Sequence, residues 1–189
     1  ENGLPGLHFV SMCDATLTFK LNPDGTKSRV LPNVESSQDL FQTVLDMGFD
    51  AVNCIGMRRG EMLSEGRMLN LCKTILRKAG LPIGKFFDYS RTVKGFFPPE
   101  IKWENVYPTI VPQWDRSPRA ATLDGIYVHA TPKAFEEHIN DALTYIEKKA
   151  PEHRIMVLKS WNEWGEGNYV EPDLEFGHGW LEAIKNTIQ

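Results

Sequence analysis

The sequence predicts an α/β fold built on a parallel β-sheet, and two features of the chain lead to this prediction. Short apolar runs, typical of buried strands, alternate with longer amphipathic stretches, typical of helices. Most successive strands are separated by a helix, which is the connection that neighbouring parallel strands require. At 189 residues the chain is long enough to form one domain with a sizeable core.

Five apolar runs are predicted to be strands. They span residues 7–12, 50–55, 82–87, 105–111 and 154–158. Each run is short and is bounded by polar or turn-forming residues, as expected of strands rather than helices. The region around the pair Pro98-Pro99 is predicted to be irregular.

Four amphipathic stretches are predicted to be helices. The first lies between an N-cap at Ser36-Ser37 and Asp46, the second runs from residue 61 to 78, the third from Thr131 to just before Pro151, and the last contains residues 180–188. Serine and threonine are favoured N-caps, and proline, found at position 132, is favoured at the first helical position. Gly48 and Gly80 provide C-terminal stops for the first two helices.

Composition excludes several functional classes. The formal net charge is −4 and no basic stripe is present, which argues against a nucleic-acid partner. No apolar run approaches the length of a membrane span. The three cysteines, Cys13, Cys54 and Cys72, are too scattered for a disulfide framework or a zinc site, so we expect buried free thiols and no metal or cofactor. Residues 1–6 show no signal-peptide pattern, and the compartment stays open between cytoplasm and export.

The stretch 160–172, Ser-Trp-Asn-Glu-Trp-Gly-Glu-Gly-Asn-Tyr-Val-Glu-Pro, is the strongest candidate for a functional site. It connects the strand 154–158 to the last helix, and in parallel α/β folds such connections carry substrate-binding residues. Glu163 and Glu166 are three residues apart, so in a turn their side chains can point the same way. Paired carboxylates beside aromatic faces, here Trp161 and Trp164, suit chemistry on a sugar.

Simpler interpretations of the same residues stay open. Glu163 could cap a helix and Glu166 could be a solvated loop charge. Both tryptophans could fill the core under the loop. Tyr169 and Glu171 either close the site or only brace it, whereas Asn162 is a candidate to bind a sugar hydroxyl.

The amino-acid sequence of this stretch resembles the signature of a known family. Residues 161–168, followed by Glu171-Pro172-Asp173, are similar to the signature of the WbsX-like proteins, glycosyltransferases of polysaccharide synthesis that are related to the endo-α-mannosidases of glycoside hydrolase family 99. Residues 112–119 resemble that family's Trp-Asp-Asn-x-Pro-Arg segment, although Arg116 and Ser117 replace the usual residues. Phe87-Asp88-Tyr89 is a looser match. The resemblance spans roughly residues 86–188, with little before.

The resemblance implies a fold of the (β/α)8 TIM-barrel type, of which this chain covers only the later, C-terminal part. We therefore expect residues 1–189 to be a single partial barrel domain. Five strands cannot close an eight-stranded barrel. The rest of the barrel would then come from another segment or from a partner chain, because the remnant would expose two strand edges. A complete, small, doubly wound domain is the alternative.

The resemblance also implies roles for individual residues. Glu163 would act as a base on the substrate's own 2-hydroxyl, and Glu166 as the general acid and later the base. Gly165 stands where those enzymes often carry histidine. The expected substrate-binding residues are Trp161, Asn162, Trp164, Asp115, Trp114, Tyr89, Asp88, Tyr169 and Glu171. Asp115 could instead pair with Arg119 and brace its loop.

The sequence is compatible with three functions. The first is a retaining glycoside hydrolase that acts on α-mannoside-like linkages in a polysaccharide or glycan. The second is a glycosyltransferase of surface polysaccharide assembly, although the sequence shows neither an Asp-x-Asp motif nor a glycine-rich phosphate cradle for a nucleotide sugar. The third is a non-catalytic carbohydrate-binding domain.

Overall fold

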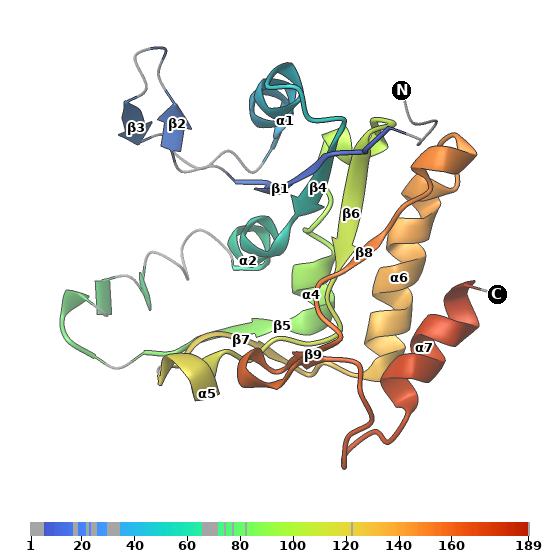
Figure 1. Cartoon of the computed structure of the whole chain (residues 1–189). Helices are drawn as coiled ribbons and strands as arrows, with labels where there is room; N and C mark the ends of the chain where they lie inside the picture. The colour runs from blue at the N-terminus through green and yellow to red at the C-terminus, as the bar shows by residue number, and fades with distance from the viewer. Residues whose placement is uncertain are drawn as a thin grey trace.

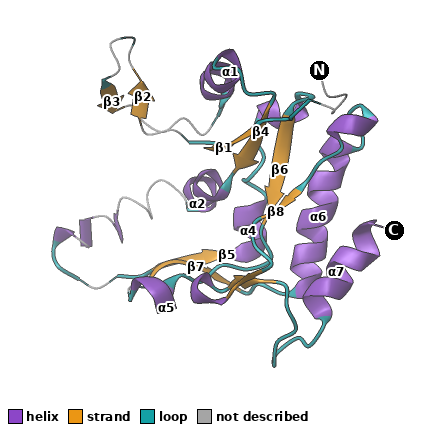
Figure 2. Ribbon diagram, viewed as in Figure 1, coloured by secondary structure: helices purple, strands orange, loops and turns teal. Residues whose placement is uncertain are grey.

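A four-stranded parallel sheet forms the centre of the molecule. The computed structural model describes residues 6–16, 19–21, 23, 26–29, 35–65, 72–73, 75–76, 78–81, 83–121 and 123–188. Within them the sheet has the order β1-β4-β6-β8, and all its strands are parallel (Figures 1 and 2). The strands are β1 (Val10–Asp14), β4 (Ala51–Ile55), β6 (Val106–Ile110) and β8 (Val157–Leu158).

Three two-stranded sheets accompany the central one. Strands β5 (Lys85–Asp88) and β7 (Asp124–Val128) form a parallel pair, which Figure 1 shows beyond the carboxyl end of the central sheet. Strands β2 (Phe19–Leu21) and β3 (Lys27–Arg29) pair antiparallel, as do β9 (Asn162–Glu163) and β10 (Asn168–Tyr169).

Helices pack against the apolar face of the central sheet. They are α1 (Gln38–Asp46), α2 (Met57–Ser64), α4 (Tyr89–Val93), α5 (Ser117–Ala120), α6 (Pro132–Ile146) and α7 (Gly179–Ile188), with 3-10 turns η1 (Pro99–Lys102), η2 (Pro151–His153) and η3 (Trp164–Glu166). Figure 1 shows α6 and α7 side by side near β8, while α1 lies near the other end of the sheet, where it contacts β4. No helix in the described ranges is long and apolar enough to cross a bilayer.

The strands predicted around residues 7–12, 50–55, 82–87, 105–111 and 154–158 all exist, with shifted ends. Strand β7 was not predicted. The predicted helix 61–78 is wrong in its bounds: α2 already begins at Met57 and ends at Ser64, because Glu65 has extended backbone angles. Residues 66–71, 74 and 77 of that prediction lie outside the described residues, and residues 72–73, 75–76 and 78 are helical as predicted. Cys13 and Cys54 are buried thiols as expected, but Cys72 is exposed.

The barrel predicted from the resemblance is not closed. In a (β/α)8 barrel each strand pairs with the next one along the chain, so β5 would lie between β4 and β6. Here β4 pairs directly with β6, and β5 pairs with β7 instead. The fold is a mixed α/β fold with parallel sheets, whose central sheet is open and ends in β1 and β8.

Three apolar clusters form the core. One joins α1 to the sheet through residues such as Phe41 and Val52, and a second surrounds Tyr89. The third packs α6 against α7, with Phe135 and Trp180 fully buried. Burying a large apolar side chain stabilises a fold by roughly 1.5–3 kcal/mol, so these clusters supply most of the driving force.

Two helix ends show how the local sequence fixes these elements. Thr131 caps α6 as predicted, since its Oγ1 accepts a hydrogen bond of 3.2 Å from the Ala134 N–H. Ser37 occupies the N-cap position of α1, but its hydroxyl donates to the Ala15 carbonyl oxygen at 2.8 Å instead of capping the helix. This serine therefore ties α1 to the end of β1.

Helices α2 and α4 approach each other through glycines. A Cβ atom at Gly56 would lie 1.9 Å from the Phe96 carbonyl oxygen, and one at Gly60 would lie 2.3 Å from the Thr92 carbonyl oxygen. Both distances are far below van der Waals contact, so only glycine fits at either position. The close approach fixes α4 and, with it, Asp88 at the start of that helix.

His138 on α6 is enclosed by aromatic rings. The Phe97 ring stacks on it at 5.5 Å and 13°, and Phe96 meets it edge-on at 5.2 Å. Neither ring nitrogen has a hydrogen-bond partner among the described residues. Burial lowers the pKa of His138 from 6.5 to about 3, because the charged form would lose its hydration.

The burial of neutral His138 predicts that the folded protein loses stability at acidic pH. The unfolded chain binds a proton at His138 below pH 6.5 while the folded chain stays neutral down to about pH 3, so stability falls as the pH drops through this window. At pH 5 the loss is roughly 2 kcal/mol relative to neutral pH. We expect His138→Phe, which keeps an apolar ring, to reduce this loss in urea unfolding at pH 7.5 and pH 5. Exposed His178→Gln serves as the control, and equal losses in parent and His138→Phe would contradict the assignment.

Candidate active site

The acidic stretch forms a short hairpin after β8. Strand β9 enters the turn η3, Gly167 reverses the chain with a φ of +51°, and β10 returns to pair with β9. The Glu163 N–H donates to Ser160 Oγ at 3.1 Å, which closes the start of this turn. The predicted turn between the two glutamates therefore exists.

The two glutamates converge on one cation. Arg119 Nη1 lies 3.6 Å from Glu163 Oε2 and 3.3 Å from Glu166 Oε1. The two oxygens are thus at most about 6.9 Å apart, against roughly 5–5.5 Å in retaining and 6.5–9.5 Å in inverting glycosidases. Both carboxylates are partly exposed, and the pair is close enough for both members to act on one glycosidic bond.

The hairpin is tied to the loop that contains Asp115. The Asp115 N–H donates to the Glu166 carbonyl oxygen at 2.9 Å, and Asn168 Nδ2 donates to the Gln113 carbonyl oxygen at 2.6 Å. Gly167 packs so closely that an added Cβ would lie 3.0 Å from the Asp115 backbone nitrogen. These contacts bring α5, which contains Arg119, next to the two acids.

The tryptophans of the hairpin face solvent. Trp161 is 55% exposed and Trp164 is 48% exposed, so they do not fill the core. Trp164 stacks on Tyr169 with ring centroids 3.6 Å apart and planes at 15°, and its Nε1 donates to Glu171 Oε2 at 2.7 Å. Tyr169 and Glu171 therefore brace Trp164, whose solvent-exposed surface offers an apolar platform of the kind that sugar rings bind.

Other predicted site residues lie in the core or form contacts that were not expected. Trp114 and Tyr89 belong to the core, and the Tyr89 hydroxyl donates to the Val111 carbonyl oxygen at 2.6 Å. Burial raises the pKa of Tyr89. Asp115 Oδ1 accepts from the Ser117 N–H at 2.9 Å, and Arg119 ion-pairs with the glutamates rather than with Asp115. Asn162 is exposed beside the acids in β9.

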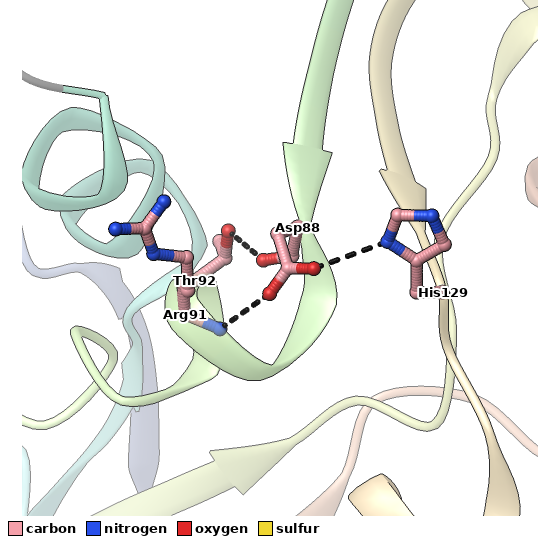
Figure 3. Close-up of polar contacts among 4 residues, drawn as sticks. All are labelled: Asp88, Arg91, Thr92 and His129. Atoms are coloured by element: carbon pink, nitrogen blue, oxygen red, sulfur yellow. Dashed lines mark hydrogen bonds and ion pairs between the residues drawn. The ribbon is translucent and has the colours of Figure 1, made fainter.

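Asp88 lies at the carboxyl end of β5, where it meets a residue that the sequence did not single out. Its Oδ2 accepts from His129 Nδ1 at 3.1 Å, and its Oδ1 accepts from the Arg91 N–H at 3.1 Å (Figure 3). The His129 hydrogen bond is the main cause that lowers the pKa of Asp88. His129 directly follows β7, so recognising that strand in the sequence would have indicated this residue.

The acid site is open rather than enclosed. Two hollows formed by described residues lie elsewhere: one is lined by Lys102, Tyr145, Lys148 and Lys149, and the other lies between α4 and α6. No group of three or more His, Cys, Asp or Glu side chains in the described ranges is arranged to hold a metal ion. The chemistry available at the site is that of two carboxylates, a guanidinium and two aromatic platforms.

Sequence comparison identifies the family. The family described as "Glycosyltransferase WbsX" matches residues 2–184. The chain belongs to this family. WbsX proteins are carbohydrate-active enzymes, as their description states, and the match begins far upstream of residue 86, where the resemblance was expected to begin.

Individual relatives cover less of the chain. Two proteins of Xanthomonas campestris pv. campestris, both named "Uncharacterized protein WxcX", are 30% and 29% identical over 106 residues, which is 56% of this chain and 15% of theirs. The chain therefore spans about 15% of the length of these curated relatives. A solved structure named "Glycoside hydrolase-like protein" superposes with a TM-score of 0.49 at 18% identity, covering 75% of this chain and 38% of its own.

The tie between hairpin and loop can be tested at Gly167. Gly167→Ala combines a left-handed backbone with crowding against Asp115, whereas Gly177→Ala, at a φ of +56° with open space around it, has the backbone strain alone. We expect Gly177→Ala to cost about 1 kcal/mol and Gly167→Ala about 2–3 kcal/mol of unfolding free energy. Equal losses in urea unfolding would mean that the close approach contributes nothing.

Proposed function

We propose that the chain carries the acid pair of a retaining glycoside hydrolase of the endo-α-mannosidase type, acting on a polysaccharide or glycan. The observation that supports this most directly is the convergence of Glu163 and Glu166 on a single guanidinium beside two exposed tryptophans. Family membership supports glycosidic-bond chemistry in general. The sugar and the roles of the two acids are our proposal.

The first step breaks the glycosidic bond. Glu163 takes the proton of the substrate's 2-hydroxyl, and that oxygen attacks the anomeric carbon to form an anhydro sugar. Glu166 gives its proton to the departing glycosidic oxygen. In the second step Glu166 removes a proton from water and the water oxygen bonds to the anomeric carbon. The bond from that carbon to the 2-oxygen breaks, and the 2-oxygen regains its proton from Glu163.

Arg119 has to move away from Glu166 during these steps. In the sugar-free protein its positive charge offsets the repulsion between the two carboxylates. Glu166 needs to face the glycosidic oxygen with a proton, so the guanidinium has to leave it when sugar binds. Arg119 is exposed and forms no other ion pair with a described residue, and a surface pair of this kind is worth only about 0–1 kcal/mol. Its displacement is therefore inexpensive.

Transfer to a sugar acceptor is the second candidate, because the family is described as a glycosyltransferase family. Where the donor is a glycan, the two functions share the first step and differ in the acceptor of the second, which is a sugar hydroxyl instead of water. Both need the same pair of acids. They are distinguished by the products formed when a second sugar is supplied.

The acid role can be tested with Glu166→Gln. The amide keeps the shape of the side chain but cannot donate the proton, so we expect turnover to fall by about 10²–10⁴-fold with sugar binding nearly unchanged. The readout is product analysis by chromatography on end-labelled α-manno-oligosaccharides, with and without an unlabelled acceptor oligosaccharide. Glu147→Gln, an exposed residue at the end of α6, is the matched control.

The products distinguish the three candidate functions. Shortened products that predominate even with the acceptor support the hydrolase, and lengthened products that predominate with the acceptor support the transferase. Equal turnover in parent and Glu166→Gln contradicts the proposed role of Glu166. Binding without turnover in the parent, lost in Trp164→Ala, would support the third candidate, a carbohydrate-binding domain.

The open sheet leads to a related proposal. Strand β1 ends the sheet, and the exposed side chains near it include Phe9 and Met12. We propose that the remaining strands come from a segment outside this chain or from a partner chain, since an unpaired apolar edge favours pairing with a further strand.

A further inference from the structure

His129 has an unusual backbone conformation. It follows β7 with a φ of +60°, and among the described residues only Ala121 shares a positive φ without being glycine. The left-handed region costs a residue with a side chain roughly 1–2 kcal/mol, and such strain is concentrated at functional sites. The conformation directs the imidazole towards β5, where Nδ1 meets Asp88 Oδ2 (Figure 3).

Asp88 is itself firmly held. Its Oδ1 accepts from the Arg91 N–H, and its backbone carbonyl accepts from Thr92 Oγ1 at 2.7 Å (Figure 3). Both bonds belong to the start of α4, which the glycines of α2 fix in place. With one oxygen fixed, the other has a defined direction towards His129.

The carboxylate determines which nitrogen of His129 carries the proton. The lowered pKa of Asp88 keeps it charged at neutral pH, and a carboxylate only accepts hydrogen bonds. Nδ1 must therefore be the donor, which leaves the lone pair of neutral His129 on Nε2. The side chain is 80% exposed, and Nε2 has no hydrogen-bond partner among the described residues. The lone pair is pre-oriented and accessible.

Two backbone hydrogen bonds connect this histidine to the acid hairpin. Tyr127, two residues before His129, donates its N–H to the Trp114 carbonyl oxygen at 2.8 Å. The next residue after Trp114 donates to the Glu166 carbonyl oxygen. His129 is thus attached to the frame that positions the acids, and both it and Asp88 lie at the carboxyl edge of parallel strands, where ligands bind in α/β folds.

We propose that His129, oriented by Asp88, is a sugar-binding residue whose Nε2 accepts a hydrogen bond from a hydroxyl of an oligosaccharide that extends beyond the two glutamates. The ligand is a neutral polyol, because an exposed lone pair accepts from hydroxyls while the adjacent carboxylate repels anions. This inference rests on the proposed function for the identity of its ligand as a carbohydrate. Asp88 acts through His129 and is a positioning residue.

The first test reads the histidine ring directly. In long-range ¹H–¹⁵N NMR correlation spectra of the 189-residue chain at pH 7.5, we expect His129 to be the Nδ1–H tautomer. Its signals are assigned by their loss in His129→Gln. In Asp88→Asn, which retains a side chain suited to the N-cap, we expect the tautomer preference to weaken. An Nε2–H tautomer in the parent would overturn the proposal regardless of any sugar.

The second test measures binding. We expect His129→Gln to weaken the affinity for α-mannotetraose about tenfold, the size of one good hydrogen bond, and to leave the affinity for methyl α-mannoside and the unfolding midpoint unchanged. His178→Gln, another exposed histidine, is the control and binds like the parent. Titration calorimetry provides the affinities.

The two proposals can fail separately. If Trp164→Ala abolishes tetraose binding while His129→Gln binds like the parent, the role of His129 is overturned and the carbohydrate function stands. If His129→Gln weakens binding of methyl α-mannoside as much as that of the tetraose, His129 does not contact an extended part of the ligand, and the proposal is again overturned.

Discussion

The hydrogen bond from the Asp115 N–H to the Glu166 carbonyl oxygen is the contact on which the candidate site depends. It joins two loops that are about fifty residues apart in sequence, and Gly167 lets their backbones meet without a side chain between them. Through it, Arg119 comes to lie next to both glutamates. A local feature, one glycine with a left-handed backbone, thus determines a long-range arrangement of charge.

The sequence predicted the elements of the fold better than their pairing. Runs such as Ala51–Ile55 and residues 131–150 carry strong local signals, apolar β-branched residues in the first and a Thr-Pro helix start in the second. Strand β7 was missed because Asp124-Gly125 has the composition of a turn, although the following residues 126–128 form a typical strand sequence. Strand order depends on packing between distant segments, which no local pattern encodes, so the direct pairing of β4 with β6 was not predicted.

For the site, the sequence indicated which residues lie close together but not which way their side chains point. The acids and tryptophans of the hairpin were predicted together because they share one short loop, and they do lie together. Motif matching also selected Tyr89, whose side chain points into the core, since adjacency to Asp88 does not reveal which way a ring faces. A pairing of Arg119 with Asp115 was one of two alternatives for that loop, and the actual partners of Arg119 depend on the contact between the two loops. His129 became visible only once β7 was placed.

The crossing of α2 and α4 limits how this family can diverge. At Gly56 and Gly60 a single methyl group would collide with a carbonyl oxygen of the opposite segment, so no rotamer change can relieve the clash. No other amino acid can replace either glycine as long as the helices keep their spacing. In distant relatives whose surfaces have changed completely, two glycines four residues apart after an apolar strand would therefore mark the same helix pair, even where the sugar-facing residues have been replaced.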